Sequence, residues 1–299
     1  MHEAATGRKV PKTAEFTDLS DYARPVALWI AGRLRDTSVT APDVTAFWGI
    51  VGLVGAFCYA AGGYEYALLG TAALQLKNIL DAVDGSLARL QSRQSRVGRF
   101  LDSIGDAAVA AAVSVGLAIA IARDRPIIYA CLLAFAALAL GLLQGSVFNY
   151  YYVRYRSRQG GDTTSRVKEQ LTQYDEIYYD DRPLALGLLR NLIGAYNWIY
   201  GWQDALVRRI DDWAVRPLTS AGYEDRADEL RDDRVLLTAV SALGPGLQIL
   251  ILNLYTVAGY RHLSLALELF LWTVAAGGTL YAAAILLRLR RAAGRLAKA

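Results

Sequence analysis

The sequence predicts an all-α, polytopic membrane protein with six transmembrane helices, and three observations support this. Of its 299 residues, 54% are hydrophobic, 20% are charged and only seven are proline. The apolar residues fall into six blocks, each close to the roughly 20 residues that a helix needs to cross a bilayer. The basic residues gather at alternate ends of these blocks, as they do in chains that weave through a membrane.

The first 43 residues are polar and lack the apolar core of a cleavable signal peptide. We expect a cytoplasmic tail over residues 1–17 and, over residues 21–35, a helix that lies in the membrane interface. The apolar face of that helix comprises Val26, Trp29, Ile30 and Leu34. An amphipathic helix docked on the rest of the protein is the alternative. Residues 38–45, SVTAPDVT, then supply a turn and a helix start.

The six predicted spans cover approximately residues 45–62, 65–84, 102–122, 127–150, 235–258 and 263–287. The fifth contains Gly244-Pro245-Gly246, which should kink it, because proline cannot donate a backbone hydrogen bond. Cys58 and Cys131 both lie inside spans, so we expect buried thiols and no disulfide. Glu268 lies inside the sixth span, where we expect it to accept a buried hydrogen bond.

The basic residues predict the orientation of the spans. Six Lys or Arg residues precede the first span, four lie between the second and third, and five follow the sixth. The loops on the opposite side hold only Arg123, Arg125 and Arg261. The positive-inside rule therefore places both termini in the cytoplasm of a multi-pass cell-membrane protein. The net charge of +4 follows from this topology, and we expect no nucleic-acid partner.

Residues 154–234 separate the fourth and fifth spans. They carry 13 basic and 15 acidic residues, interleaved with tyrosines and tryptophans. We expect cytoplasmic or interfacial helices here, because the segment has too few apolar residues to fold as a domain of its own. The sequence thus divides into residues 1–43, with the tail and interfacial helix, and a six-span domain over residues 44–299.

Four aspartates and four arginines stand together in residues 77–112, and the sequence that flanks them is almost uninterruptedly apolar. Asp81 and Asp84 share one helical face at the end of the second span, and Asp102 and Asp106 share one at the start of the third. The polar connection between the spans can turn the chain so that the four carboxylates converge. Converging carboxylates repel one another, and a hard divalent cation such as Mg²⁺ or Mn²⁺ relieves that repulsion. Two ions about 4 Å apart can share such ligands.

A metal centre of this kind suits a diphosphate, whose oxygens the ions neutralise. Arg89 can add a bidentate contact to a phosphate. Gly85, Ala88 and Gly98 lack bulk, so a nucleotide or a neighbouring helix can approach the backbone there. The purely structural alternative is a set of ion pairs that cap two helices, in which the aspartates meet Arg89, Arg93, Arg96 and Arg99.

The spacing Asp81-x2-Asp84-Gly85-x2-Ala88-Arg89-x8-Gly98-x3-Asp102-x3-Asp106 resembles, residue for residue, the signature of the class I, integral membrane CDP-alcohol phosphatidyltransferase family. The resemblance implies a metal-dependent enzyme of phospholipid biosynthesis that transfers a phosphoalcohol group from a CDP-linked donor to a hydroxyl and releases CMP. It implies that Asp81, Asp84, Asp102 and Asp106 ligate the metals and that Asp106 is also the general base. Gly85, Ala88, Arg89 and Gly98 would line the pocket for CMP and the diphosphate.

Several readings stay open beside this one. CDP-diacylglycerol is the favoured donor, with a polar alcohol such as inositol phosphate, glycerol phosphate or serine as acceptor. A soluble CDP-alcohol donor with a lipid hydroxyl acceptor is the alternative, and a membrane prenyltransferase or a transporter also keeps aspartates in the membrane. Residues at the end of the fourth span can bind an anionic acceptor or anchor the membrane surface: Asn149, Arg154, Arg156 and Arg158. The resemblance also favours a homodimer.

Overall fold

The computed structural model describes residues 10–160, 169–179 and 182–298, and within these ranges it contains helices and no strands. The first helices in chain order are η2 (Lys12–Ala14), α1 (Arg24–Leu34), α2 (Ala41–Ala61), α3 (Tyr64–Leu90), α4 (Arg96–Ile121) and α5 (Ile127–Arg158). Then come α6 (Gln173–Tyr178), α7 (Pro183–Tyr196), η3 (Asn197–Gly201), α8 (Trp202–Thr219), α9 (Glu224–Arg231) and α10 (Arg234–Ser241). The chain ends with α11 (Pro245–Ala258), α12 (Leu263–Trp272), η4 (Thr273–Gly278) and α13 (Thr279–Leu296). The all-α prediction is confirmed for the described residues.

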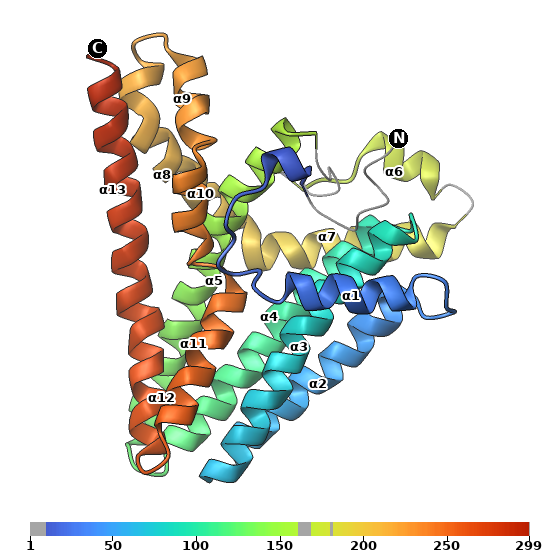
Figure 1. Ribbon diagram of the computed structural model, residues 1–299, viewed down its shortest axis with the longest axis vertical. Helices are drawn as coiled ribbons and strands as arrows, with labels where there is room; N and C mark the ends of the chain where they lie inside the picture. Colours follow the sequence, from blue (N-terminus) through green and yellow to red (C-terminus); the bar gives the residue numbers. More distant parts are fainter. Residues whose placement is uncertain (1–9, 161–168, 180–181, 299) are drawn as a thin grey trace.

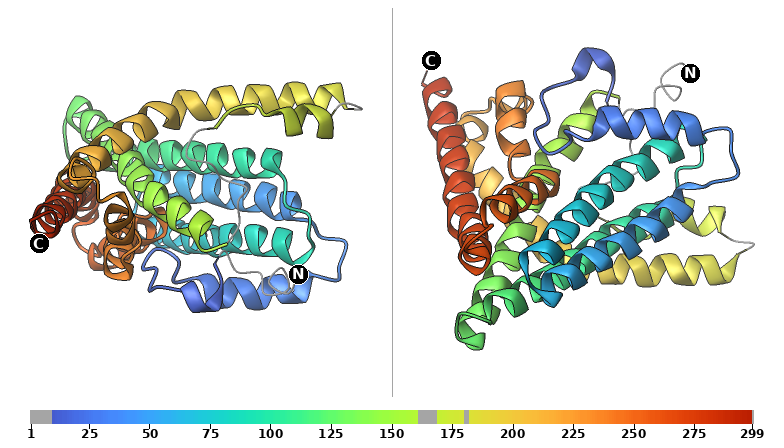
Figure 2. Two further views of the ribbon diagram at one scale, coloured as in Figure 1. Left: turned by 90° about the horizontal axis from the view of Figure 1, so that it is seen from above. Right: turned by 60° about the horizontal axis from the view of Figure 1, so that its bottom comes forward.

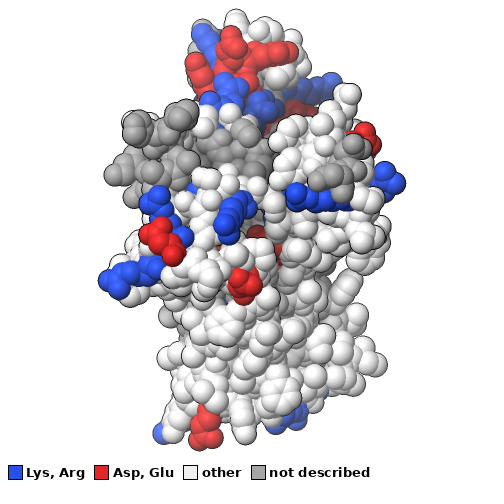
Figure 3. Space-filling model, turned by 90° about the vertical axis from the view of Figure 1, so that its right-hand side faces the viewer, with Lys and Arg blue, Asp and Glu red and all other residues white. Residues whose placement is uncertain are grey.

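Four helical stretches are long and apolar enough to cross a membrane, namely α2, α4, α5 and the stretch from α12 to α13. The pair α10 and α11 makes a fifth if the two count as one broken span, bent by 45° at the predicted Gly244-Pro245 break. Helix α3 has 27 residues, but Lys77, Asp81 and Asp84 make it too polar to qualify. The face in Figure 3 agrees with a membrane protein, because a broad band of uncharged side chains separates the charged upper part from a few charged side chains at the lowest end.

Helices α2, α3 and α4 form a closely packed group that crosses the molecule diagonally in Figure 1. Helix α2 begins as predicted, with Thr40 and Asp43 in a reciprocal capping box. Gly116 on α4 lies so near Ala56 of α2 that a Cβ atom there would stand 2.4 Å from the Ala56 carbonyl oxygen. Such a contact brings the backbones of α2 and α4 together, and α2 also packs on α3, so α2 holds both helices of the group.

The predicted helix at residues 21–35 forms as α1, and its apolar face is divided between two surroundings. Ala27 and Ala31 are fully buried in a cluster with Val83 and Leu87 of α3, and Ile30 and Leu34 pack beside them. Val26 and Trp29 remain exposed, at 49% and 62%. The helix is therefore docked on the protein and still presents apolar side chains outward. The first nine residues of the predicted tail lie outside the described residues.

The described residues between 154 and 234 form mostly helices, as expected, and these helices pack on the other elements. Helix α7 packs on α4, and α8 packs on α13 and α5. In Figure 2 the line from α7 to α8 runs along one side of the bundle when seen from above, and α1 lies on the opposite side. Glu268 accepts hydrogen bonds from Tyr129 (2.6 Å) and Arg125 (2.8 Å), as predicted, but these bonds are not buried, because Glu268 is only partly buried and Arg125 is exposed.

Candidate functional site

The turn between α3 and α4 brings the aspartates of the two helices together. Helix α3 ends in a left-handed residue, Ser92, with φ of 53°, and the Arg93 N–H donates back to the Ala88 carbonyl. Helix α4 then starts at an N-cap, Ser95, whose Oγ accepts from the Gly98 N–H at 3.0 Å. This short, fixed connection places the end of α3 beside the start of α4.

Three of the four predicted aspartates meet in one group. Asp81, Asp102 and Asp106 each offer a carboxylate oxygen, and these oxygens all lie within 4.8 Å of one another. All three side chains are partly exposed, so a ligand can reach them. Asp102 Oδ1 is buried and has no hydrogen-bond partner among the described residues, which is unfavourable for a carboxylate oxygen unless a cation or donor binds it. An all-oxygen set with an unsatisfied buried member fits Mg²⁺ or Mn²⁺.

Asp84 is held differently from the other three. Its Oδ2 accepts hydrogen bonds from Thr45 Oγ1 at 2.6 Å and from Trp48 Nε1 at 2.8 Å, both on α2. Asp84 is buried, and it is not one of the three residues whose oxygens gather within 4.8 Å. Sequence reasoning did not select Thr45 or Trp48, because nothing in the local pattern of α2 shows that this helix faces the motif.

Lys77 is a further functional candidate that sequence reasoning missed. Its ammonium lies 3.6 Å from Asp81 Oδ2, makes an ion pair with Asp106, and stands 4.3 Å from the centre of the Trp48 ring. The side chain is only 6% exposed. One signal was available, since Lys77 precedes Asp81 by four residues and therefore shares its face. The site thus contains a buried cation of its own among the carboxylates.

The residues predicted to line a nucleotide pocket lie on the same helix ends. The buried Arg89 guanidinium lies over Gly85, where a Cβ atom would stand 3.5 Å from Nη1, an ordinary contact distance. Packing within the protein therefore does not demand glycine at 85, which is compatible with a ligand approaching there. Ala88 is partly exposed beside them. At Gly98 a Cβ atom would lie 3.0 Å from Ser95 Oγ, a tight contact with the oxygen that caps α4, so packing within the protein also favours glycine there.

The structural alternative of aspartates paired with arginines does not hold for Arg96 and Arg99. Arg96 binds Glu169 (2.9 Å) and Asp175, and Arg99 binds Glu169 (2.7 Å). Asp102 lies inside α4, beyond its N-cap Ser95, so it does not cap the helix. These two arginines bind the segment after α5 to α4, so they do not neutralise the carboxylates of Asp81, Asp102 and Asp106.

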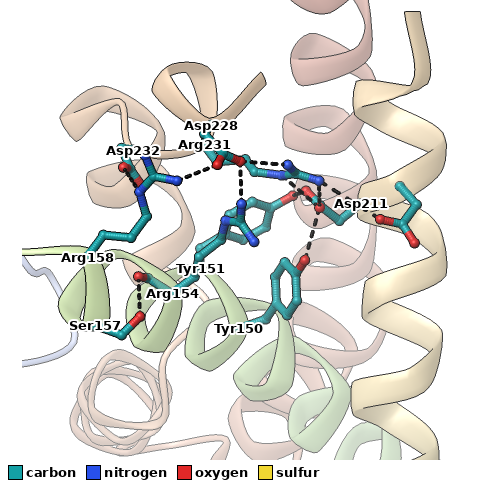
Figure 4. Close-up of polar contacts among 10 residues, drawn as sticks. Tyr150, Tyr151, Arg154, Ser157, Arg158, Asp211, Asp228, Arg231 and Asp232 are labelled. Atoms are coloured by element: carbon teal, nitrogen blue, oxygen red, sulfur yellow. Dashed lines mark hydrogen bonds and ion pairs between the residues drawn. The ribbon is translucent and has the colours of Figure 1, made fainter. Parts of the chain in front are cut away.

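A second polar cluster, drawn in Figure 4, occupies the end of α5 and the neighbouring α8 and α9. Arg154 and Arg158 pair with Asp228, and Arg158 also binds Asp232 at 2.9 Å. Arg231 holds the fully buried Asp211 through Nε (2.9 Å) and Nη2 (2.6 Å). Arginines 154 and 158 are therefore occupied by carboxylates of the chain itself.

Arg156 differs from both of its neighbours. It is 5% exposed, and its Nε and Nη2 atoms are buried without a hydrogen-bond partner among the described residues. These are the two atoms with which Arg231 grips a carboxylate, and they form one edge of the planar guanidinium. The Tyr152 ring lies 5.7 Å from the guanidinium carbon. A buried guanidinium edge of this kind is suited to an oxyanion.

Comparison with known proteins agrees with the motif. Residues 39–173 match the family model described as CDP-alcohol phosphatidyltransferase, a range that includes α2, α3, α4, α5 and the whole aspartate motif. No curated protein matches the chain. Helices α7 to α13 lie beyond the matched range.

Proposed function

Because residues 39–173 match the CDP-alcohol phosphatidyltransferase family model, we propose that the chain transfers a phosphatidyl group from CDP-diacylglycerol to a polar alcohol and releases CMP. The observation that carries the proposal is the gathering of Asp81, Asp102 and Asp106, with a buried and unsatisfied Asp102 oxygen. The family match over residues 39–173 favours this chemistry over that of a prenyltransferase or a transporter. The proposed topology has six spans, with α3 as the sixth, and a cytoplasmic site.

The carboxylates would hold one or two divalent ions, with Asp84 joining them if its contacts to α2 loosen. Bound there, Mg²⁺ or Mn²⁺ would supply charge neutralisation for the diphosphate and for the departing phosphate. Arg89, Gly85, Ala88 and Gly98 would bind the CMP half of the donor. Asp106 would take the proton of the acceptor hydroxyl, which requires that Lys77 first release or share this carboxylate.

The bonds change in one displacement. The acceptor oxygen forms a bond to the phosphorus that bears the diacylglycerol, and the bond from that phosphorus to the bridging oxygen breaks. The bridging oxygen leaves on CMP, and the hydroxyl proton resides on Asp106. Lys77 lies one turn before Asp81 and is a cation placed to offset negative charge that develops near the Asp81 carboxylate.

Arg156 supports an acceptor that carries a phosphate. Arg156 lies near the C-terminal end of α5, and Asp81 lies in the C-terminal part of α3. Because α3 and α5 both run upward in Figure 1, the two residues are at the same end of the bundle. Tyr152, whose ring lies beside the Arg156 guanidinium, also interacts electrostatically with Arg24, and Arg24 donates hydrogen bonds to Ala82 and Ser86 on α3. A phosphate bound to Arg156 would thus stand near the helix that holds Asp81.

The direct test is release of CMP. Purified enzyme in detergent is incubated with Mg²⁺, CDP-diacylglycerol and, separately, glycerol phosphate, inositol phosphate or serine. We expect CMP with a phosphorylated acceptor, and none from Asp106→Asn. A parallel series with soluble CDP-alcohols and diacylglycerol tests the alternative donor. Absence of CMP in every combination would contradict the proposed function.

A matched pair of variants tests the acceptor class. Arg156→Gln should raise the KM for the phosphorylated acceptor at least about tenfold, since a charged hydrogen bond contributes roughly 1.5–3 kcal/mol. Arg158→Gln, whose guanidinium is already paired with Asp228 and Asp232, should leave that KM unchanged. Equal KM values for the two variants would remove Arg156 from the acceptor site.

A further inference from the structure

Helix α7 is apolar on both of its faces. Its sequence, PLALGLLRNLIGAY, contains one charged residue, Arg190. One face is buried: Leu189, Leu192, Ile193 and Tyr196 form a cluster with Phe100 of α4. The other face is open, with Leu184 90% and Leu188 46% exposed. A helix that is apolar all round requires an apolar environment on each side, and the described residues supply one on its inner side alone.

The open apolar face continues through η3 into α8. Trp198 is 82% exposed and Trp202 is 54% exposed, and Leu206 follows one turn later. Leu184, Leu188, Trp198, Trp202 and Leu206 recur at intervals that keep them on one side of the continuous α7–η3–α8 helix. We call these five side chains the outer stripe.

The position of the helix agrees with the edge of a membrane. Helix α7 crosses the bundle near the first turns of α4, which is one of the candidate spans (Figure 1). On the opposite side of the bundle, α1 lies in a similar orientation and presents Val26 and Trp29 outward (Figure 2). Tryptophan is the residue type enriched where hydrocarbon meets the headgroups of a bilayer.

The inner side of the same helix reaches the candidate active site. Helix η3 is a single π-helical stretch, a feature often found at functional positions. It presents Tyr200, whose hydroxyl donates to the Ser103 carbonyl at 3.1 Å, next to Asp102. The pairs formed by Arg96 and Arg99 with the nearly buried Glu169 fasten the preceding segment to α4. These contacts fix the inner side of the helix to α4 beside the candidate active site and leave the outer stripe facing away from the protein.

We propose that α7, η3 and α8 form one helix seated in the lipid–water interface, with the outer stripe against bilayer lipid. The occupant is lipid because the outer stripe lies beside a candidate span, carries tryptophans and has no apolar protein surface opposite it among the described residues. In addition, and resting on the proposed function, this helix is the wall along which the lipid substrate approaches Tyr200 and the aspartates.

Depth-dependent quenching tests the location. The variants Trp198→Cys and Trp202→Cys, made in a Cys131→Ser background, are labelled with bimane and reconstituted into nanodiscs of ordinary or brominated phospholipid. An interfacial helix inserts its apolar face about 5–10 Å into the headgroup and acyl boundary, so bromine near the top of the chains should lower bimane fluorescence about twofold. Glu229→Cys, an exposed position on α9, is the matched control and should show no quenching.

Each outcome decides the proposal, and none depends on turnover. Quenching at positions 198 and 202 but not at 229 supports it. Equal fluorescence in both lipids would place the stripe in water, and disulfide cross-linking of Trp198→Cys between two chains would assign the stripe to a second copy; either overturns the proposal. As a second arm, Trp198→Ser with Trp202→Ser should raise the KM for long-chain CDP-diacylglycerol about tenfold, whereas Glu229→Ser should not. If CMP is never released, the quenching result still stands.

Discussion

The substitution Asp211→Asn tests how the helices beyond the family match are held to α5. Asp211 on α8 is fully buried and accepts four hydrogen bonds (Figure 4). Tyr150 (3.0 Å) and Tyr151 (2.8 Å) donate from α5, and Arg231 donates through Nε and Nη2 from α9. An asparagine would remove the charge and turn an amide N–H toward groups that are themselves donors.

The expected loss follows from the burial of Arg231, whose side chain is 9% exposed. Removing one partner of a buried ion pair costs about 3–5 kcal/mol, because the remaining charge is left without compensation. Arg231 keeps Asp228 at 3.0 Å, so we expect the lower end, about 3 kcal/mol. At roughly 2–4 °C per kcal/mol for a chain of this order of size, Tm should fall by about 6–12 °C.

A thiol-reactive fluorogenic dye can follow this unfolding in detergent, since Cys58 is buried and becomes reactive when the helices separate. The exposed Cys131 is replaced by serine in all samples. Asp212→Asn is the control: it removes the same charge one residue later, but the Asp212 side chain is 76% exposed, and we expect a change below about 0.5 kcal/mol. If the two variants lower Tm equally, the buried network does not hold these helices as argued.

Two further predictions concern the candidate site and the interfacial helix. Lys77→Met should raise the affinity for Mn²⁺ at least tenfold in an electron paramagnetic resonance titration without substrate, because at about 4 Å an ammonium opposes each unit of positive charge by roughly 4 kcal/mol at an effective dielectric constant of 20. Lys77→Arg keeps the charge and should leave the affinity unchanged. An unchanged affinity in Lys77→Met would refute the idea that the Lys77 ammonium competes with the metal. Burial raises the pKa of Asp204 to about 6, against the effect of Arg208, so the folded chain holds a proton that the unfolded chain releases above about pH 4. The free energy of unfolding of the wild type therefore falls between pH 4 and 6. Relative to the wild type, Asp204→Asn should become more stable over that window by on the order of 2 kcal/mol, and the difference should stay constant above pH 6. Parallel profiles of Tm against pH for the two proteins would contradict this.

The sequence by itself determined the helices and the motif. Apolar runs fixed the helical blocks, since backbone groups in a membrane must be satisfied within one helix. Gly244-Pro245 fixed a break, and the spacing from Asp81 to Asp106 fixed which carboxylates share a face. These are local features, so the order of residues along one helix suffices to predict them.

The tertiary structure decided which partners those side chains receive. Only the packing of α2 on α3 shows that Thr45 and Trp48 hold Asp84, and only the docking of α7 on α4 brings Tyr200 to Ser103. Similarly, Arg154 and Arg156 are two residues apart in sequence, yet Arg154 pairs with Asp228, whereas Arg156 is buried and meets no carboxylate in the part of the chain that the structure describes. Such contacts join residues far apart in the chain, and their energies depend on burial and distance, which helical periodicity does not encode.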